Sequence, residues 1–373
     1  MPREEKHKLI KPYVACCVQA YVENNNPSLK GGFEGDELKK RNLEMMCDYI
    51  DSMFFHGESA VKLVCFPEFG IGGMYAQKTK VEEVKKYEAI SIPGPETDVL
   101  AAKAKQHAIY IAACNHENDP SLPDNFMNTA FIINPKGKII LKYRKVDTQF
   151  GCAPHDIHDK YINPITGTRD YFPVVDTEIG RLACMICADV GSPEIPRVYA
   201  LKGAEVLMHL NGGHVGEIDH IKLRARAADN TIYVLTENWA GSILVNKKIG
   251  DTLIPLRIRT GKSSGGSMII DPYGKIIAES DGCTPQLVEG KIDIMYLREK
   301  RGMWLKGGVG NYLARRRAEM YTAYESRTIF PPNGVLKAGS MKHAHDETVT
   351  KRRNEAVQNI LNGYDYYSED DVK

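Results

Sequence analysis

Short apolar runs alternate with longer amphipathic segments along most of the chain, and this alternation limits the fold more than any other feature. Apolar runs of about four to eight residues that end at Gly, Pro or charged residues are typical of buried strands. The segments between them carry apolar residues at helical spacing, as in the Leu- and Met-rich stretch 36–54. The predicted strands are Tyr13–Ala20, Val61–Phe66, Ala108–Ala113, Asn125–Asn134, Lys138–Tyr143, Leu182–Ile186 and Glu205–His209. Such alternation, with no internal repeat, predicts an α/β fold.

Composition argues against several classes of partner. Of the 373 residues, 43% are hydrophobic and 26% are charged, as in soluble globular proteins. The 49 basic and 48 acidic residues nearly balance, so we expect no nucleic-acid partner. No apolar run reaches membrane-spanning length, and the charged start Met1–Lys8 is not followed by the apolar stretch of a signal peptide. We therefore also expect no membrane partner.

Cysteine usage bears on compartment and on cofactors. The nine cysteines are an odd number without a regular framework, which is typical of free thiols in a reducing compartment, so we expect a cytoplasmic protein. Cys184 and Cys187 form a C-x-x-C spacing. A redox pair of this spacing normally opens a helix, whereas residues three apart on a strand point to opposite faces. Because no second C-x-x-C completes a zinc site, we expect neither a metal nor a cofactor.

Cys187 stands where a predicted strand turns into a predicted helix. Leu182–Ile186 precede it, Ser192 is predicted to cap the helix with Pro193 at the first position, and Gly203 lies just beyond the helix end. Backbone N–H groups at such a turn lower the pKa of a thiol and stabilise a developing oxyanion. The pattern is typical of a nucleophile, although a buried cysteine before an ordinary turn has the same sequence signature.

Two further predicted strands end in groups with complementary chemistry. Val61–Phe66 is followed by Pro67 and Glu68, and Lys138–Tyr143 runs into an arginine and then Lys145. In layered α/β proteins the carboxyl ends of strands border the crevice in which ligands bind. A carboxylate, an ammonium group and a thiol at equivalent places therefore indicate a shared site.

These three segments resemble, in order and in context, the signature segments of the nitrilase superfamily of carbon–nitrogen hydrolases. The resemblance covers about residues 10–295. Within the family, the motifs of this chain are most similar to those of the aliphatic amidase branch. It implies a four-layer α-β-β-α sandwich. The matching residues are Pro67-Glu68, Tyr143-Arg-Lys145 and Ile186-Cys187-Ala-Asp189 with Pro193-Glu194, and further similarity lies at Asn128–Gly137, Arg224–Asn230, Tyr233–Asn238 and Ser267–Gly274.

The resemblance implies thiol-dependent hydrolysis of a non-peptide C–N bond. Cys187 is then the nucleophile and Glu68 the general base and acid. Lys145 and the backbone N–H of Ala188 are expected to stabilise the tetrahedral oxyanion. We expect Asp189 to order the turn rather than to react. The family requires no metal and no cofactor.

One loop departs from the family pattern. Relatives carry a second glutamate between the lysine and cysteine segments, whereas residues 147–171 contain none. Asp159 is the first candidate to replace it and Asp156 the second. The histidines beside both aspartates also suit a metal ion, but their spacing matches no known signature, so we interpret the segment as a polar active-site loop. We expect 211–214 to rim the pocket, where His214 either donates to the substrate or caps its own loop.

The residues after the cysteine narrow the substrate class. Nitrile-cleaving relatives have Trp-Glu there, whereas this chain has Ala188-Asp189. Relatives that cleave carbamoyl amino acids place arginines just beyond, whereas this chain has Val190-Gly-Ser, although Arg224 or Arg226 can still supply a guanidinium from elsewhere. We therefore expect a small linear amide as the substrate. An N-carbamoyl compound is the alternative, as is acyl transfer to an amine acceptor.

The chain changes character near residue 296. We expect 1–295 to form the carbon–nitrogen hydrolase catalytic domain and 296–373 to form a C-terminal extension. The extension contains the basic triplet Arg315–Arg317 and an acidic, Tyr-rich end at 364–371. Because aromatic residues are favoured at interfaces and the family commonly assembles through such extensions, we expect a homo-oligomer, at least a dimer.

Overall fold

Two six-stranded sheets form the centre of the protein. The structure, a computed structural model, describes residues 9–24, 35–57, 59–74, 81–148, 153–161, 171–213, 215–240, 242–249, 252–259, 265–303, 313, 316–320 and 333. In pairing order, the first sheet contains β14 (Gln286–Ile292), β1 (Tyr13–Gln19), β2 (Val61–Cys65), β3 (Tyr110–Glu117), β4 (Met127–Ile133) and β5 (Ile139–Arg144). The second contains β13 (Ile276–Glu279), β12 (Met268–Ile270), β9 (Tyr233–Glu237), β8 (Val206–Leu210), β7 (Gly180–Ile186) and β6 (Val175–Thr177).

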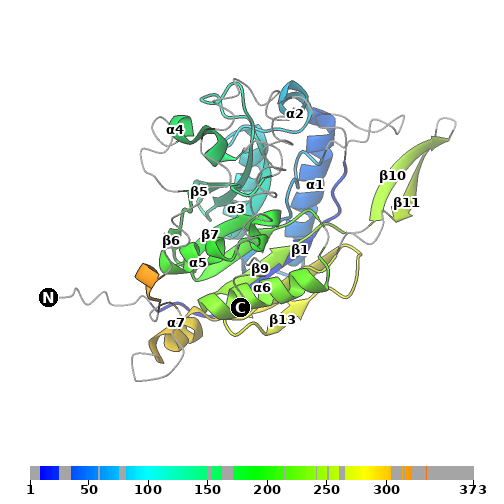
Figure 1. The fold of residues 1–373 in the computed structure, drawn as a ribbon. Helices are drawn as coiled ribbons and strands as arrows, with labels where there is room; N and C mark the ends of the chain where they lie inside the picture. The colour runs from blue at the N-terminus through cyan, green and yellow to red at the C-terminus, as the bar shows by residue number, and fades with distance from the viewer. Residues whose placement is uncertain are drawn as a thin grey trace, which may run out of the picture.

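Helices cover the outer faces of both sheets, which gives the four layers that the sequence predicts (Figure 1). The first sheet is covered by α1 (Asp36–Met53) and α3 (Pro95–His107), and the second by α5 (Glu194–Leu201) and α6 (Glu217–Asn230). The other described helices are α2 (Val81–Tyr87), α4 (His158–Tyr161) and α7 (Ile294–Met303), with short 3-10 turns η1 (Pro154–Ile157), η3 (Cys187–Gly191) and η5 (Ala318–Met320). None of the described helices has the length and apolar content needed to cross a membrane.

Alternating side chains of each strand fill different layers. In β1, Cys16 points to the helical side, where it packs in one cluster with Met46 of α1 and Leu100 of α3. Its neighbour Cys17 belongs to the core between the sheets, and this core continues to Tyr199 of α5. Period-two alternation therefore buries both faces of the first sheet.

The strand directions bring the predicted site residues to one end of the sandwich. β1, β2 and β3 are parallel, and β5 runs with them because the antiparallel β4 lies between β3 and β5. In the second sheet β7, β8 and β9 are parallel. A parallel bridge between Ala20 and Trp239, just beyond the ends of β1 and β9, joins the carboxyl ends of the two sheets. The ends of β2, β5 and β7 therefore face one another across the sandwich.

The start of the helix after Cys187 differs from the prediction. The 3-10 turn η3 separates β7 from α5, which begins at Glu194, and the Ser192 side chain makes no capping hydrogen bond. The prediction of a Ser192 cap was wrong because η3 ends there, and the Ser192 N–H donates back to Asp189 O at 3.1 Å. At the other end Gly203 has a φ of 88°, so its predicted place just past the helix is confirmed.

Two strand regions go beyond the sequence prediction. β3 continues to Glu117, four residues past the predicted end at Ala113, because it pairs with β4 as far as Glu117 opposite Met127. The hairpin of β10 (Ser242–Ile249) and β11 (Thr252–Arg259) forms a separate two-stranded sheet that stands away from the sandwich (Figure 1).

Candidate active site

Three side chains at the ends of three strands meet in the structure. Glu68 follows β2, Lys145 follows β5, and Cys187 follows β7. Lys145 Nζ donates to Glu68 Oε1 at 3.1 Å, and the Glu68 carboxylate lies close enough to the Cys187 thiol to raise its pKa. Glu68 is 2% exposed and Lys145 is 8% exposed, while Cys187 is half-buried. A carboxylate, an ammonium group and a thiol therefore share one site from which most water is excluded.

A buried carboxylate holds the turn that carries the nucleophile. Cys187 has a φ of 46°, a left-handed conformation that costs energy for a residue other than glycine. Asp189 is fully buried and accepts hydrogen bonds from the Ile186 N–H at 2.8 Å, the Asp147 N–H at 3.0 Å and the Tyr143 hydroxyl at 2.7 Å. These bonds join the end of β7 to the end of β5. Asp189 thus orders the turn, the role expected from the sequence.

Neighbouring strands fix the position of Glu68. Asn128 of β4 donates through Nδ2 to Glu68 Oε1 at 2.6 Å, and its backbone carbonyl accepts from the Lys145 N–H at 2.9 Å. Trp239 Nε1 donates to the Glu68 carbonyl oxygen at 2.6 Å. Sequence reasoning gave Asn128 no role. The available signal was its place at the start of the family-like segment 128–137.

Two glycines bring the backbone close to the reactive groups. A Cβ at Gly212 would lie 3.2 Å from Glu68 Oε2 and 3.1 Å from the Trp239 ring, while one at Gly213 would lie 3.9 Å from Cys187 Sγ. The segment therefore runs beside the thiol, where the sequence predicts the rim of the pocket. The missing side chains leave space next to the sulfur.

Burial and neighbouring charges set the protonation states. Burial raises the pKa of the Cys187 thiol to about 12, and the negative charge of Glu68 adds to this shift. The charge of Lys145 and the Ala188 N–H act in the opposite direction. For Lys145, burial favours the neutral form, but the charge of Glu68 and other acidic neighbours outweighs it and raises the pKa above its ordinary value. At neutral pH the lysine is charged and the thiol is protonated, so thiol attack requires a base.

A buried histidine that sequence reasoning overlooked contacts the nucleophile's backbone. His209 in β8 is 2% exposed, with Nε2 at 2.9 Å from Cys187 O and Nδ1 at 2.8 Å from Thr236 Oγ1. Burial lowers the pKa of His209 to about 4, so the ring is neutral at neutral pH. The available signal was a single histidine in the apolar run Val206–Leu210.

The other predicted site residues have different outcomes. The Ala188 N–H lowers the pKa of the Cys187 thiol and so lies next to the sulfur, a suitable position for an oxyanion donor. Asp159 lies in α4 with an exposed side chain, and its N–H donates to Asn333 Oδ1 at 2.9 Å. Its assignment as the substitute for the second glutamate stays a prediction. His214 lies outside the described residues.

The two arginines considered for carboxylate binding make backbone contacts instead. Arg224 Nε donates to Gly274 O at 2.8 Å. Arg226 donates to Val190 O through Nε at 3.3 Å and Nη2 at 3.2 Å, which ties α6 to η3. Their observed contacts are therefore packing contacts. Among the residues that the structure describes, no group of three or more His, Cys, Asp and Glu side chains is arranged to hold a metal ion.

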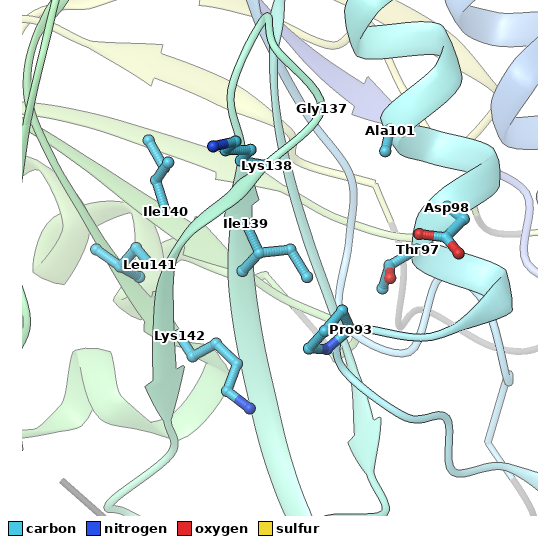
Figure 2. A pocket seen from close by; sticks show the side chains of 10 residues that line it. All are labelled: Pro93, Thr97, Asp98, Ala101, Gly137, Lys138, Ile139, Ile140, Leu141 and Lys142. Carbon is cyan, nitrogen blue, oxygen red and sulfur yellow. The ribbon is translucent and has the colours of Figure 1, made fainter.

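A surface hollow of about 530 Å³ lies apart from these groups. Figure 2 shows it between α3, the turn at 135–137 and the edge strand β5. None of the three site side chains lines it. The lining residues are Pro93, Thr97, Asp98, Ala101, Gly137, Lys138, Ile139, Ile140, Leu141 and Lys142.

The sandwich and the three converging side chains define a hydrolase-type site of the kind that the sequence resembles. Residues 35–302 match the family described as carbon-nitrogen hydrolase, and the chain belongs to this family. Formamidases of Bacillus thuringiensis (strain Al Hakam) and Bacillus anthracis are each 34% identical over 188 residues, which cover 50% of this chain and 52% of theirs. The chain thus spans about half the length of the curated relatives it matches.

Solved structures share the fold at low sequence identity. The carbon-nitrogen hydrolase from Helicobacter pylori G27 is 19% identical with a TM-score of 0.61, covering 85% of this chain and 99% of that chain. Saccharomyces cerevisiae Nit3, a member of branch 10 of the nitrilase superfamily, is 22% identical with a TM-score of 0.56, covering 79% and 94%. An amidase from Nesterenkonia sp. is 20% identical with a TM-score of 0.56, covering 84% and 96%. These likenesses confirm the predicted sandwich.

Proposed function

We propose that this protein hydrolyses the C–N bond of a small linear amide and releases a carboxylic acid and ammonia. The observation that carries the proposal is the convergence of Glu68, Lys145 and Cys187, in which Glu68 accepts a hydrogen bond from Lys145 and raises the pKa of the Cys187 thiol. Amides resist direct attack by water, and a thiol nucleophile divides the reaction into two easier steps. The site has a nucleophile, a base and a cation for those steps.

In the first step Cys187 Sγ attacks the amide carbonyl carbon while Glu68 accepts the thiol proton. The carbonyl oxygen becomes an oxyanion, which the Ala188 N–H and the Lys145 ammonium stabilise. Glu68 then gives the proton to the departing nitrogen, the C–N bond breaks, and ammonia leaves an acyl-Cys187 thioester. The raised pKa of Cys187 makes this transfer to Glu68 necessary, because little thiolate exists beforehand.

In the second step water attacks the thioester. Glu68, again unprotonated, takes a proton from that water. The Ala188 N–H and the Lys145 ammonium group stabilise the oxyanion of this second tetrahedral intermediate as they did the first. Collapse of the intermediate breaks the C–S bond, and the proton on Glu68 returns to the sulfur. The carboxylic acid product then leaves.

A neutral and small substrate suits the site. Arg224 and Arg226, the guanidinium candidates for a carboxylate, are engaged with backbone carbonyls. The similarity to formamidases favours a short acyl group, and the two glycines keep side chains away from the neighbourhood of the thiol and the Glu68 carboxylate. An N-carbamoyl compound and transfer of the acyl group to an amine acceptor remain the alternatives raised by the sequence.

The test is ammonia release from a panel of formamide, acetamide, longer aliphatic amides and N-carbamoyl compounds. We expect turnover of at least one short amide by the unmodified chain and none by Cys187→Ala. Cys187→Ser should be nearly inactive, because a carboxylate is too weak a base to activate an alcohol. His107→Phe, a change in α3 far from the site, is the control for unspecific damage. Full activity in Cys187→Ala would contradict the mechanism.

A further inference from the structure

We propose that His209 is a positioning residue that aims the oxyanion-binding N–H of Ala188 by holding the carbonyl end of the same peptide group. This inference rests on the proposed amide hydrolysis and deepens it. His209 touches neither the thiol nor the carboxylate. It acts through the peptide bond that joins Cys187 to Ala188.

Peptide geometry links the two ends. The Cys187 carbonyl and the Ala188 N–H belong to one planar trans peptide group, so they point in opposite directions. His209 Nε2 lies 2.9 Å from the carbonyl oxygen, and the N–H at the other end of the peptide acts on the Cys187 thiol, whose pKa it lowers. Any rotation of the carbonyl away from His209 therefore turns the N–H away from the place where the oxyanion forms.

This peptide needs a dedicated anchor. Cys187 is held at a φ of 46°, which is unfavourable unless surrounding contacts maintain it. The other contacts of the turn act on different peptide groups, since Asp189 accepts from the Ile186 N–H and Arg226 donates to Val190 O. Within the described residues, His209 is the side chain that hydrogen-bonds the carbonyl of the nucleophile itself.

The tautomer of the ring follows from its partners. A carbonyl oxygen only accepts, so Nε2 must carry the hydrogen. In the neutral ring Nδ1 is then an acceptor, and we assign the single Thr236 hydroxyl hydrogen to Nδ1 at 2.8 Å rather than to the His209 carbonyl oxygen at 3.3 Å because the first contact is shorter. A chain of hydrogen bonds thus runs from Thr236 through His209 to the peptide, and such chains polarise their members and strengthen the last donor.

Variants of His209 can separate the donor from the volume of the ring. His209→Phe keeps a ring of similar size but has no donor. In His209→Gln the side chain loses the ring, but its amide nitrogen can donate in place of Nε2. A packing role predicts that Phe is tolerated at least as well as Gln, whereas the positioning role predicts the reverse. His107→Phe is the matched control for the substitution, since His107 lies in α3 and pairs with Asp51 of α1.

Three measurements on the full chain report different parts of the site. They are kcat and KM for an amide substrate, the affinity of the corresponding aldehyde, and the rate of Cys187 alkylation by 2-iodoethanol, which has no carbonyl group. An aldehyde adds to the thiol and places its oxygen where the oxyanion forms, so its binding reports on the oxyanion site without any turnover. Its affinity is measured by the protection of Cys187 from alkylation. Alkylation displaces iodide at a saturated carbon and develops no oxyanion on the substrate carbonyl, so it reports only thiol access and activation.

For His209→Phe we expect kcat and aldehyde affinity to fall about tenfold to a hundredfold, because a donor displaced by a fraction of an ångström loses most of its effect. KM and the alkylation rate should change less than about threefold. His209→Gln should recover most of the kcat and aldehyde affinity, and His107→Phe should match the unmodified chain. If His209→Phe does not fold, Thr236→Val tests the same chain of bonds and should lower both quantities.

Equal aldehyde affinity in the unmodified chain and His209→Phe would overturn the inference, as would equal loss in Phe and Gln. A fall in alkylation as large as the fall in kcat would also overturn it, because this indicates general damage to the site. If only Thr236→Val folds, an unchanged kcat and aldehyde affinity in that variant would also overturn the inference. If the unmodified chain hydrolyses no amide but the aldehyde affinities differ as expected, the proposed function fails and the positioning role stands.

Discussion

At the scale of single residues, Glu68 has two opposing effects on the nucleophile. Its negative charge adds to the burial that raises the pKa of Cys187 to about 12, and its oxygen is the base that removes the thiol proton. The protonated thiol is therefore poorly reactive toward electrophiles other than the substrate, and it becomes nucleophilic only as its proton moves to Glu68. Lys145 balances the carboxylate and remains charged throughout.

Glu68→Gln should separate these effects. Removing the negative charge should lower the pKa of the Cys187 thiol, so the ultraviolet absorbance of the thiolate should appear at a lower pH than in the unmodified chain. Despite more thiolate, kcat should fall by about a hundredfold to ten-thousandfold, because the proton carrier is lost. Subtracting the same titration of Cys187→Ala isolates the single thiol. A higher thiol pKa in Glu68→Gln would refute this assignment.

At the scale of elements, the turn η3 depends on Asp189 for its shape. One carboxylate joins β7, the segment after β5 and the hydroxyl of Tyr143. The nucleophile and the end of the lysine strand are therefore coupled mechanically through a group that does not react. This contact explains how two sheets hold their reactive groups in register.

Asp189→Asn should weaken both stability and catalysis. The amide NH₂ cannot accept, so at least one of the three donors loses its partner in a buried place, at a cost of about 1–3 kcal/mol in the free energy of unfolding. We expect kcat to fall with it, as measured by urea unfolding and by turnover below the transition. Asp271→Asn, which affects an exposed turn where Asp271 accepts from the Tyr273 and Lys275 N–H groups, should do much less. Equal effects of the two variants would argue against the coupling.

The same residue predicts a pH dependence of stability. Burial raises the pKa of Asp189 to about 6, from an ordinary value of 3.8. Between these values the folded chain holds a proton that the unfolded chain has lost, so the contribution of Asp189 to the free energy of unfolding falls as the pH rises from about 4 to 6. Asp189→Asn should remove this part of the slope. Urea unfolding of both chains across that range, with identical slopes, would show that Asp189 titrates normally.

At the scale of the whole molecule, the site exists only because two sheets present their carboxyl ends together. The alternation of apolar runs was sufficient for an α/β fold, and the family resemblance implied the four-layer sandwich. Glu68, Lys145 and Cys187 could be picked out because each follows an apolar run and so marks the end of a strand. It was not sufficient for Asn128 and His209, whose roles depend on which strands pair and which face each side chain occupies. The Ser192 cap failed for a related reason, since the 3-10 turn is stabilised by Asp189 contacts to a distant strand.

The C-terminal part of the chain leads to a prediction about assembly. α7 crosses the predicted boundary after residue 295, with Leu297 buried in the core and Arg298 Nε donating to Glu205 Oε1 at 2.6 Å, while Arg316 and Arg317 are exposed. We propose that the region beyond α7 contributes to a homo-oligomer. Truncation after Met303 should lower the mass measured by light scattering at micromolar concentration, with a small loss of stability because Leu313, which packs against the core, and the Asn333 contact to Asp159 are also removed. A monodisperse monomer for the full chain would rule this out.

The most direct test of the mechanism is the mass of the enzyme during turnover. The chain is mixed with a short amide, quenched in acid before the reaction finishes, and analysed as intact protein and as peptides. The mechanism predicts a mass increase equal to the acyl half of the amide, located on the peptide that contains Cys187, absent from Cys187→Ala and reversed by hydroxylamine. An adduct on another cysteine, or ammonia release with no adduct under conditions that favour its accumulation, would contradict the acyl-thiol intermediate.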